Sequence, residues 1–151
     1  MAEPLLAPGE PAPAIVRQGA RDCPFVLVAD HAGNAIPRAL GDLGLSQADR
    51  ARHIAWDIGI AGVAEALAER LGAPLVRQRY SRLVIDCNRD PARADAIPET
   101  SDGSAIPGNA AIDADARAQR VAAIHAPYHA AIAATLADRA PATIVVALHS
   151  F

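Results

Sequence analysis

Residues 24–34 read PFVLVADHAGN, and this stretch gives the clearest indication of the fold. The continuous apolar run from Pro24 to Ala29 is typical of a strand that is buried on both faces. The run ends at Asp30 and passes into a polar, glycine-containing segment that has the composition of a loop. The stretch therefore predicts an interior strand of a largely buried sheet, with polar side chains at its carboxyl end.

Two helical patterns follow. Ser46 and Asp49 form a start that resembles a capping box, with Asp in place of the usual Glu, and the helix is expected to break near residues 57–59. It ends at Gly72, a normal helix terminator. A second helix is expected over residues 113–139, where Pro127 must kink it or divide it in two.

Strand patterns lie between and after the helices. Residues 75–79 and 83–87 are two predicted strands, joined as a hairpin or as one bent strand, and residues 143–148 form the last one. Residues 90–111 are expected to be a long loop, which in a compact domain is often functional. This order predicts an α/β fold of three layers, with helices flanking a mixed, mostly parallel central sheet.

The composition restricts the class of protein. The 151 residues fit a single domain, in which the Pro- and Ala-rich residues 1–22 are expected to form an extended arm. The hydrophobic content is 52% and the aromatic content 3%, so the core must consist mainly of Ala, Leu, Ile and Val. The net charge of -3 argues against nucleic acid as a partner. All 14 basic residues are Arg, which excludes chemistry that needs a lysine.

The two cysteines do not suggest a disulfide or a thiolate zinc site. Cys23 and Cys87 are far apart and belong to no CxxC pair, so we expect buried free thiols. The first residues lack the basic start and the apolar run of a signal peptide. No apolar stretch reaches the length of a membrane span. We therefore expect a cytoplasmic protein without a membrane partner, and its oligomeric state stays open.

Polar side chains follow three of the predicted strands. They are Asp30, His31 and Asn34 after the first, Asp86, Asn88 and Arg89 after the middle one, and His149 after the last. The carboxyl ends of parallel strands meet at one edge of a sheet, where sites of α/β proteins collect. We therefore expect these side chains to share a cleft.

The chemistry of this cleft favours a metal site. His31 and His149 are natural zinc ligands, and a catalytic zinc site usually takes three protein ligands. Asp86 is a candidate to orient one imidazole through its other ring nitrogen. Arg89 has the planar fork that holds a substrate carboxylate. The alternative is that residues 86–89 form only a turn with a surface ion pair.

Other candidates carry weaker patterns. His53 and Asp57 are four residues apart and offer an oriented acid or a third metal ligand, although the pattern alone favours a local hydrogen bond beside Trp56. His125 and His129 have the same spacing, but Pro127 lies between them, so one buried and one exposed histidine are expected. The Arg-rich residues 77–82 offer an anion site or a solvated strand edge.

Five strings, taken together, resemble the N-formylglutamate amidohydrolase family. They are VLVADHAGNAIP, HIAWDIGIAGVAEALAERL, YSRLVIDCNRDP, APYHAAI and VVALHSF, in this order between about residues 25 and 151. The resemblance implies hydrolysis of N-formyl-L-glutamate to L-glutamate and formate, or of another small N-acyl amino acid to the free amino acid and the carboxylate of its acyl group. That reaction lies late in one route of histidine degradation.

The family is distantly similar to zinc carboxypeptidases and aspartoacylase-type deacylases, whose phosphorylase/hydrolase-like fold is implied here. Their metal ligands are a His-x-x-Glu pair and a later His. His31 and His149 match the histidines, but Asn34 stands at the glutamate position. An amide oxygen is a weaker ligand, so the resemblance implies one zinc or other divalent ion, held with Asn34 or with Asp57 or Asp30 in its place.

The Asp-x-Asn-Arg string of those relatives matches three further residues of this chain. By this resemblance Asp86 orients a zinc histidine, while Asn88 and Arg89 hold the carboxylate of the substrate. Arg82 lies where the deacylases keep an arginine that stabilises the oxyanion.

The family continues past the string that ends at Phe151, and in the relatives a later glutamate is the base and then the acid. We therefore expect a C-terminally truncated, partial amidohydrolase domain with an incomplete sheet. Two other hypotheses stay open at this point: a non-catalytic remnant that binds small acidic ligands, and a structural domain without a ligand.

Overall fold

A four-stranded mixed sheet forms the centre of the protein. The computed structural model describes residues 4–151, so residues 1–3 of the expected arm lie outside the described residues. The strands are β1 (Ala14–Arg17), β2 (Phe25–Ala29), β3 (Leu75–Gln78) and β6 (Ile144–Ala147), in the order β1-β3-β2-β6. β2 runs parallel to both β3 and β6, whereas β1 pairs with β3 in the antiparallel direction.

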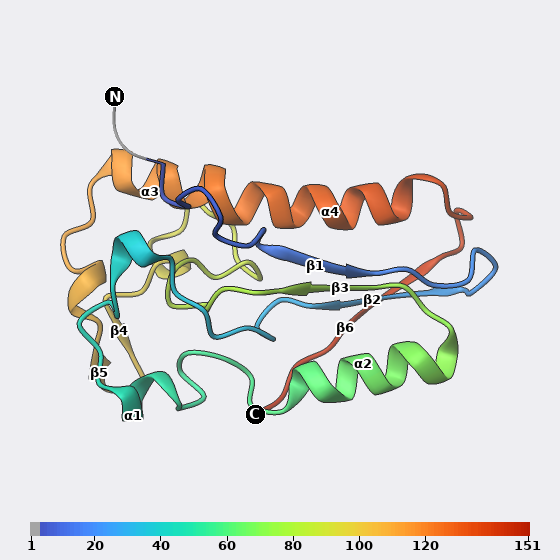
Figure 1. Ribbon diagram of the computed structural model, residues 1–151, viewed down its shortest axis with the longest axis horizontal. Coiled ribbons are helices and arrows are strands. Elements are labelled where there is room, and N and C mark those ends of the chain that lie inside the picture. Colours follow the sequence, from blue (N-terminus) through green and yellow to red (C-terminus); the bar gives the residue numbers. More distant parts are fainter. Residues whose placement is uncertain (1–3) are drawn as a thin grey trace.

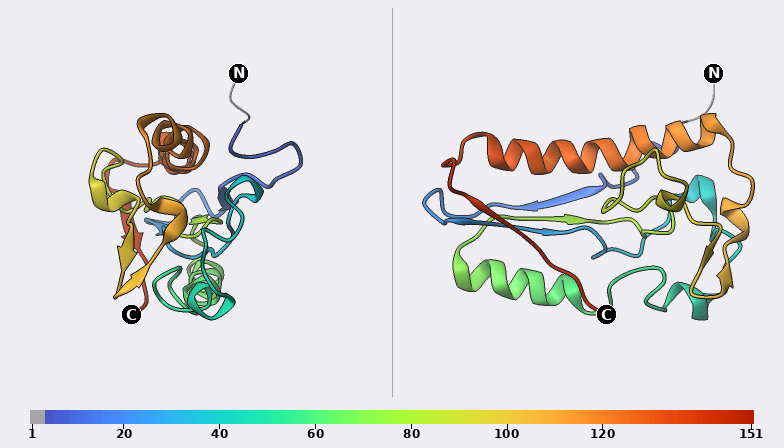
Figure 2. Two further views of the ribbon diagram at one scale, coloured as in Figure 1. Left: turned by 90° about the vertical axis from the view of Figure 1, so that its left-hand side faces the viewer. Right: turned by 180° about the vertical axis from the view of Figure 1, so that it is seen from behind.

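Helices cover both faces of this sheet. The α-helices are α1 (Gln47–Arg50), α2 (Ile60–Leu71), α3 (Ala114–Arg120) and α4 (Ala126–Ala137). Figure 1 shows α4 along one face and α2 along the other, and the end-on view in Figure 2 separates the same layers. The predicted three-layer α/β fold with a mostly parallel sheet is therefore confirmed.

The side chains of β2 alternate between two hydrophobic cores, as the period of a strand requires. Val26 and Val28 pack into the core that also contains Tyr128 of α4. Leu27 and Ala29 point to the opposite core, which the small residues Ala64 and Ala68 of α2 line. Because alanine side chains are short, α2 packs close to the sheet. Aliphatic side chains fill these cores, as the composition predicts.

The boundaries of the first helical region follow its caps. The hydroxyl of Ser46 accepts a hydrogen bond from the backbone nitrogen of Asp49 at 3.0 Å, so α1 begins as predicted. The expected break is confirmed and is longer than the pattern indicated, since turns separate α1 from α2. Gly72 ends α2 in the left-handed conformation, with φ of 63°. Glycine adopts this conformation without the steric cost of a Cβ atom.

The strand predicted over residues 83–87 is wrong. These residues form turns and irregular backbone, although all of them are buried. Side chains satisfy part of their backbone: Asn109 donates to the Leu83 carbonyl at 2.8 Å and Arg120 to the Val84 carbonyl at 3.0 Å. The apolar run therefore reflects burial beneath α3 and not pairing with a neighbouring strand. Since an apolar run reports burial only, its sequence does not separate these two cases.

Part of the expected extended arm belongs to the sheet. Within residues 4–22, Ala14–Arg17 is strand β1 and belongs to the sheet. Backbone hydrogen bonds to β3 hold it there, and the composition of the arm gave no indication of that distant partner.

The long loop predicted over residues 90–111 contains short elements. They are η2 (Ala94–Ala96), β4 (Thr100–Ser101), β5 (Ser104–Ala105) and η3 (Pro107–Asn109). A further short helix, η1 (Arg38–Leu40), precedes α1.

The second long helix is divided, as predicted. A π-turn, η4 (Val121–His125), separates α3 from α4, and Pro127 lies in the first turn of α4, where a proline is tolerated. His125 is buried and His129 is exposed, which confirms that prediction. Both cysteines are buried free thiols, also as expected. None of the helices formed by residues 4–151 has the length and apolar content that a bilayer crossing needs.

Candidate metal centre and active site

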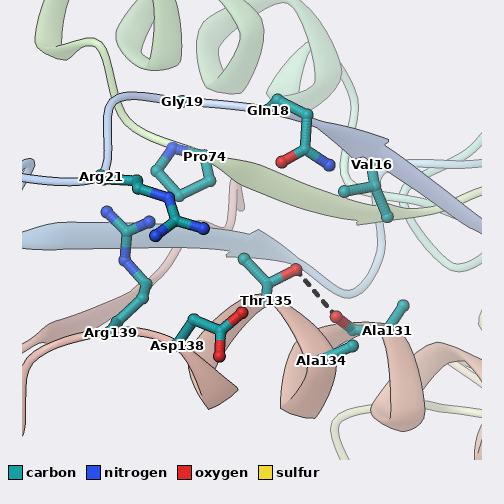
Figure 3. A pocket seen from close by; sticks show the side chains of 10 residues that line it. All are labelled: Val16, Gln18, Gly19, Arg21, Pro74, Ala131, Ala134, Thr135, Asp138 and Arg139. Atoms are coloured by element: carbon teal, nitrogen blue, oxygen red, sulfur yellow. Dashed lines mark hydrogen bonds between the residues drawn. The ribbon is translucent and has the colours of Figure 1, made fainter.

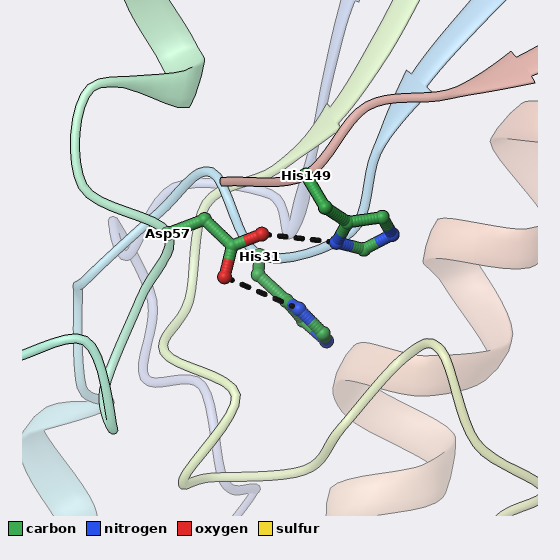
Figure 4. Close-up of side chains that lie close together, drawn as sticks. All are labelled: His31, Asp57 and His149. Atoms are coloured by element: carbon green, nitrogen blue, oxygen red, sulfur yellow. Dashed lines mark hydrogen bonds and ion pairs between the residues drawn. The ribbon is translucent and has the colours of Figure 1, made fainter. Parts of the chain in front are cut away.

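Three side chains from distant parts of the chain meet beyond the carboxyl ends of the parallel strands. They are His31, which follows β2, His149, which follows β6, and Asp57, which lies in the turn before α2 (Figure 4). One potential ligand atom from each lies within 4.8 Å of the other two. His31 and Asp57 are buried and His149 is partly buried. The predicted convergence of strand ends therefore brings both histidines together.

Asp57 lies between the two imidazoles. Its Oδ2 is 2.9 Å from Nδ1 of His149, and its Oδ1 is 3.6 Å from Nδ1 of His31. The backbone nitrogen of Asp57 also donates to the His31 carbonyl at 2.9 Å, which fixes this turn against the end of β2. The two Nδ1 atoms and the carboxylate consequently face one another.

The opposite nitrogen of His31 contacts a second buried carboxylate. Nε2 of His31 lies 2.7 Å from Oδ1 of Asp86. Burial alone would raise the pKa of Asp86, but the His31 hydrogen bond and the nearby charge of Arg82 lower this pKa to about 2. A carboxylate that stays ionised accepts the Nε2 proton of His31 and leaves Nδ1 with a free lone pair.

The donor set fits a divalent metal ion. Nδ1 of His31 is buried and has no hydrogen-bond partner among the described atoms, which is unusual for a buried polar atom. Two imidazoles and one carboxylate are the protein ligands of several catalytic zinc sites. His31, Asp57 and His149 are therefore the residues that could hold one ion.

Asn34 makes a different contact from the one that the resemblance implied. Its Nδ2 donates to the Arg50 carbonyl at 2.6 Å, at the end of α1. The residue that lies between the two histidines is Asp57, named from the sequence as its substitute. Gly33 allows the backbone between His31 and Asn34 to pass close to Arg79, since an added Cβ atom would lie 1.9 Å from the Arg79 carbonyl oxygen. Only glycine permits this close approach beside the predicted ligands.

A cleft of about 510 Å³ opens over the three-residue group. Its lining residues are His31, His53, Asp57, Arg82, Asn88, His149, Ser150 and Phe151. Five of the candidate site residues named from the sequence therefore line the same cleft. Arg89 is not among the lining residues: its guanidinium pairs with Asp86 at 3.3 Å and also with Asp95.

Arg82 adds positive charge at the edge of this cleft. Its Nη2 lies 2.8 Å from Oδ2 of Asp86, and its Nη1 lies 3.9 Å from Oδ1 of Asp57. The backbone nitrogen of Asn88 donates to Oδ1 of Asp86 at 2.9 Å. Asp86 is thus the common partner that fixes the positions of His31, Arg82 and the loop that carries Asn88.

Sequence reasoning underestimated two residues of the cleft. The spacing of His53 and Asp57 favoured a local hydrogen bond, but turns separate the two residues, and His53 is an exposed lining residue 3.4 Å from Asp102. The backbone nitrogen of Ser150 donates to Oδ2 of Asp57 at 3.2 Å. The only sequence signal for Ser150 is its position next to His149.

A second hollow, of about 450 Å³, lies near the amino end of β3 and the carboxyl end of the antiparallel strand β1 (Figure 3). Its charged lining residues are Arg21, Asp138 and Arg139. Arg139 donates to the carbonyls of Ala20 and Cys23 and so closes the loop before β2. Arg139 therefore has a structural role in this hollow. The residues that could bind a metal lie in the cleft at the other end of the sheet.

Comparison with known proteins agrees with the geometry. The family described as N-formylglutamate amidohydrolase matches residues 23–151. No curated protein matches the chain. The crystal structure of a gene product from Agrobacterium tumefaciens is 39% identical, with a TM-score of 0.92, over 97% of this chain and 60% of that chain.

The crystal structure of N-formylglutamate amidohydrolase from Ralstonia eutropha JMP134 shares the fold, with 24% identity and a TM-score of 0.64. The match covers 93% of this chain and 57% of that one. This chain therefore spans about 60% of the length of the solved structures that it resembles. Since the family match covers most of its residues, the chain belongs to the N-formylglutamate amidohydrolase family.

Proposed function

We propose that the cleft is the active site of a metal-dependent amidohydrolase that cleaves N-formyl-L-glutamate to L-glutamate and formate. The observation that carries this proposal is the group of His31, Asp57 and His149, in which a buried imidazole nitrogen faces a carboxylate and has no hydrogen-bond partner. The family match supports the reaction class.

In this proposal one divalent ion is held by His31, Asp57 and His149. When bound, such an ion supplies a Lewis acid, which makes a water molecule acidic near neutral pH and polarises a carbonyl group. The protein contributes the geometry: Asp86 keeps the proton of His31 on Nε2, so that Nδ1 is available.

Arg82 and Asn88 supply the remaining polar groups of the cleft. Hydrolysis adds water to the formyl carbon, breaks the C–N bond and transfers a proton to the leaving amine. Negative charge develops on the formyl oxygen before that bond breaks, and the guanidinium of Arg82 is the cation that lines the cleft. A positioned donor of this kind stabilises the transition state.

The carboxylate of glutamate needs its own partners. Asn88 lines the cleft and is available for this contact. Arg89 is engaged with Asp86 and Asp95, so in our proposal it exchanges Asp95 for the carboxylate of the substrate. The exchange preserves the charge balance of the guanidinium, because one carboxylate replaces another.

The second candidate function is binding of a small acidic ligand without turnover. It is favoured by one observation: none of the described residues that line the cleft is a glutamate, whereas the relatives need one as base and acid. Arg82 and Asn88 would still attract a carboxylate in such a protein.

One experiment separates the two candidates. The 151-residue protein is stripped with a chelator, reloaded with Zn²⁺, and assayed for formate release from N-formyl-L-glutamate. We expect one ion per chain, formate release that depends on the ion, and loss of the ion in His31→Ala and His149→Ala. His129→Gln is the matched control, since the polar contact of His129 is to the Cys87 carbonyl and His129 lies outside the three-residue group.

Binding of N-formyl-L-glutamate by calorimetry, with no formate released by the zinc-loaded protein, would favour the second candidate. Unchanged metal content in both alanine variants would contradict the metal site itself.

A further inference from the structure

His149 has a second carboxylate neighbour that the proposed metal site does not use. Its Nδ1 faces Asp57, whereas its Nε2 lies 3.7 Å from Oδ2 of Asp30. His31 shows the same arrangement, with Nδ1 toward Asp57 and Nε2 toward Asp86. Each imidazole therefore lies between Asp57 and a carboxylate of its own.

Asp30 itself is held by a tyrosine from the opposite layer. The hydroxyl of Tyr128 donates to Oδ1 of Asp30 at 2.7 Å, and Tyr128 is completely buried. Burial raises the pKa of Tyr128, and the charge of Asp30 raises it further, so the hydroxyl keeps its proton. With one oxygen bound to this donor, the other oxygen of Asp30 is directed at His149.

The partners of the two orienting carboxylates differ. Asp86 is neutralised by two arginines, Arg82 and Arg89, in addition to His31. Asp30 has no arginine partner among the described residues, and the side chains nearest to its two oxygens are those of Tyr128 and His149. A buried carboxylate of this kind is costly unless it is paired. The negative charge of Asp30 therefore acts mainly on the imidazole of His149.

The position of Tyr128 is fixed by an irregular part of the helix. The π-turn η4 directly precedes α4, and such turns are frequently found at functional sites. On either side of Tyr128, His125 contacts the Arg89 carbonyl at 3.0 Å and His129 contacts the Cys87 carbonyl at 2.9 Å. These contacts anchor α4 against the 86–89 segment and place the tyrosine hydroxyl beneath the cleft.

We propose that Asp30, held by Tyr128, is a positioning residue whose charge orients the His149 imidazole, with Nε2 toward Asp30 and Nδ1 toward Asp57. This inference rests on the proposed metal site, and it assigns to Asp30 a role outside the ligand set. Removal of the hydroxyl frees Oδ1, so the carboxylate can rotate away from His149. Replacement of the carboxylate by an amide removes the charge that faces the imidazole.

The test uses the two tyrosines of the chain as a matched pair. Tyr128→Phe removes the hydroxyl bound to Asp30, and Tyr80→Phe removes a hydroxyl that donates to the Pro11 carbonyl at 2.7 Å. Tyr80 is also almost fully buried. Both variants lose one tyrosine hydrogen bond, and only Tyr128→Phe alters the surroundings of His149.

The first readout is the dissociation constant for Zn²⁺, measured by competition with a chromophoric chelator. We expect Asp30→Asn to weaken binding by roughly 10- to 100-fold, the range for residues that orient a metal-bound histidine. Tyr128→Phe is expected to weaken it by a smaller factor and Tyr80→Phe not at all. Wild-type affinity in Asp30→Asn would overturn the proposal, and so would equal losses in the two tyrosine variants.

The second readout is the ¹⁵N chemical shifts of the His149 imidazole in the metal-free protein. We expect them to change in Asp30→Asn and Tyr128→Phe and to stay constant in Tyr80→Phe. Unchanged shifts in Asp30→Asn and Tyr128→Phe would overturn the proposal, and this result would not depend on metal binding. Zinc binding without formate release would contradict the proposed reaction only, so the two failures are distinguishable.

Discussion

At the scale of single residues, the cleft depends on buried carboxylates that have different partners. Asp57 faces both Nδ1 atoms, Asp86 accepts from His31 and pairs with arginine, and Asp30 accepts from Tyr128. The same residue type therefore has three roles that only its surroundings distinguish. Burial strengthens each interaction because the local dielectric constant is low.

Arg82 gives the first prediction at this scale. Arg82→Ala should lower kcat by roughly 100- to 1000-fold, the usual effect of removing a donor that stabilises an oxyanion, and should leave KM nearly unchanged. Steady-state assays of formate release provide the measurement, together with metal content, because Arg82 also pairs with Asp86. Arg79→Ala is the control, since Arg79 is held by the Ala12 carbonyl at the edge of the sheet. A rise in KM at constant kcat would assign Arg82 to substrate binding instead.

Cys87 gives a prediction about pH and stability. Burial raises the pKa of its thiol from 9.0 to about 12. Above the lower value the unfolded chain loses this proton while the folded protein keeps it, so the contribution to stability is present below pH 9 and is lost toward pH 12. The free energy of unfolding in urea should therefore fall with pH in this window, and less steeply in Cys87→Ala. Identical slopes in the two proteins would contradict the shift.

At the scale of elements, the site is built from segments that have no regular structure. The 83–87 segment carries Asp86 but forms turns, and its backbone is held by side chains from η3 and α3. Arg120 is central to this arrangement, since it donates to Val84, Asn109 and Gly108. Burial lowers the pKa of Arg120 to about 10, and its hydrogen bonds satisfy three acceptors at once.

Arg120→Met should therefore destabilise the protein strongly. The variant leaves buried carbonyl groups without a donor, and we expect a loss of about 3 kcal/mol in the free energy of unfolding. Chemical denaturation measures this loss, and Arg117→Met is the matched control because Arg117 lies on the same helix and is less buried. A change below 0.5 kcal/mol in Arg120→Met, within the range of ordinary surface substitutions, would show that water replaces these contacts.

At the scale of the whole molecule, β6 is an edge strand of the described sheet. It pairs only with β2, and its residues Ile144 and Val145 are 54% and 46% exposed. Open apolar edges are templates for pairing with another chain. The solved structures that resemble this chain are longer, because the chain covers 60% and 57% of them.

We therefore expect the 151-residue polypeptide to self-associate through β6 at high concentration. Val145→Lys should raise the concentration at which association begins, since a charged side chain on an edge strand opposes pairing. Sedimentation velocity over a range of concentrations provides the measurement. Val63→Lys is the control, because Val63 is 59% exposed on α2, away from the edge. Equal effects of the two substitutions would point to nonspecific association.

The sequence by itself determined the features that depend on neighbouring residues. The buried strand β2, the cap at Ser46, the end of α2 at Gly72 and the division of the second helix all follow from local patterns. The meeting of His31 and His149 also followed, because parallel strands end at the same edge of a sheet.

Only the tertiary structure decided which carboxylate meets which imidazole. Asp86 is 55 residues from His31, and Asp57 is 92 residues from His149. Contacts of this kind depend on how the layers pack, and they produce no periodic pattern in the sequence. For the same reason the sequence offered Asn34, Asp30 and Asp57 as alternatives, and the packing placed Asp57 between the histidines and Asp30 behind His149.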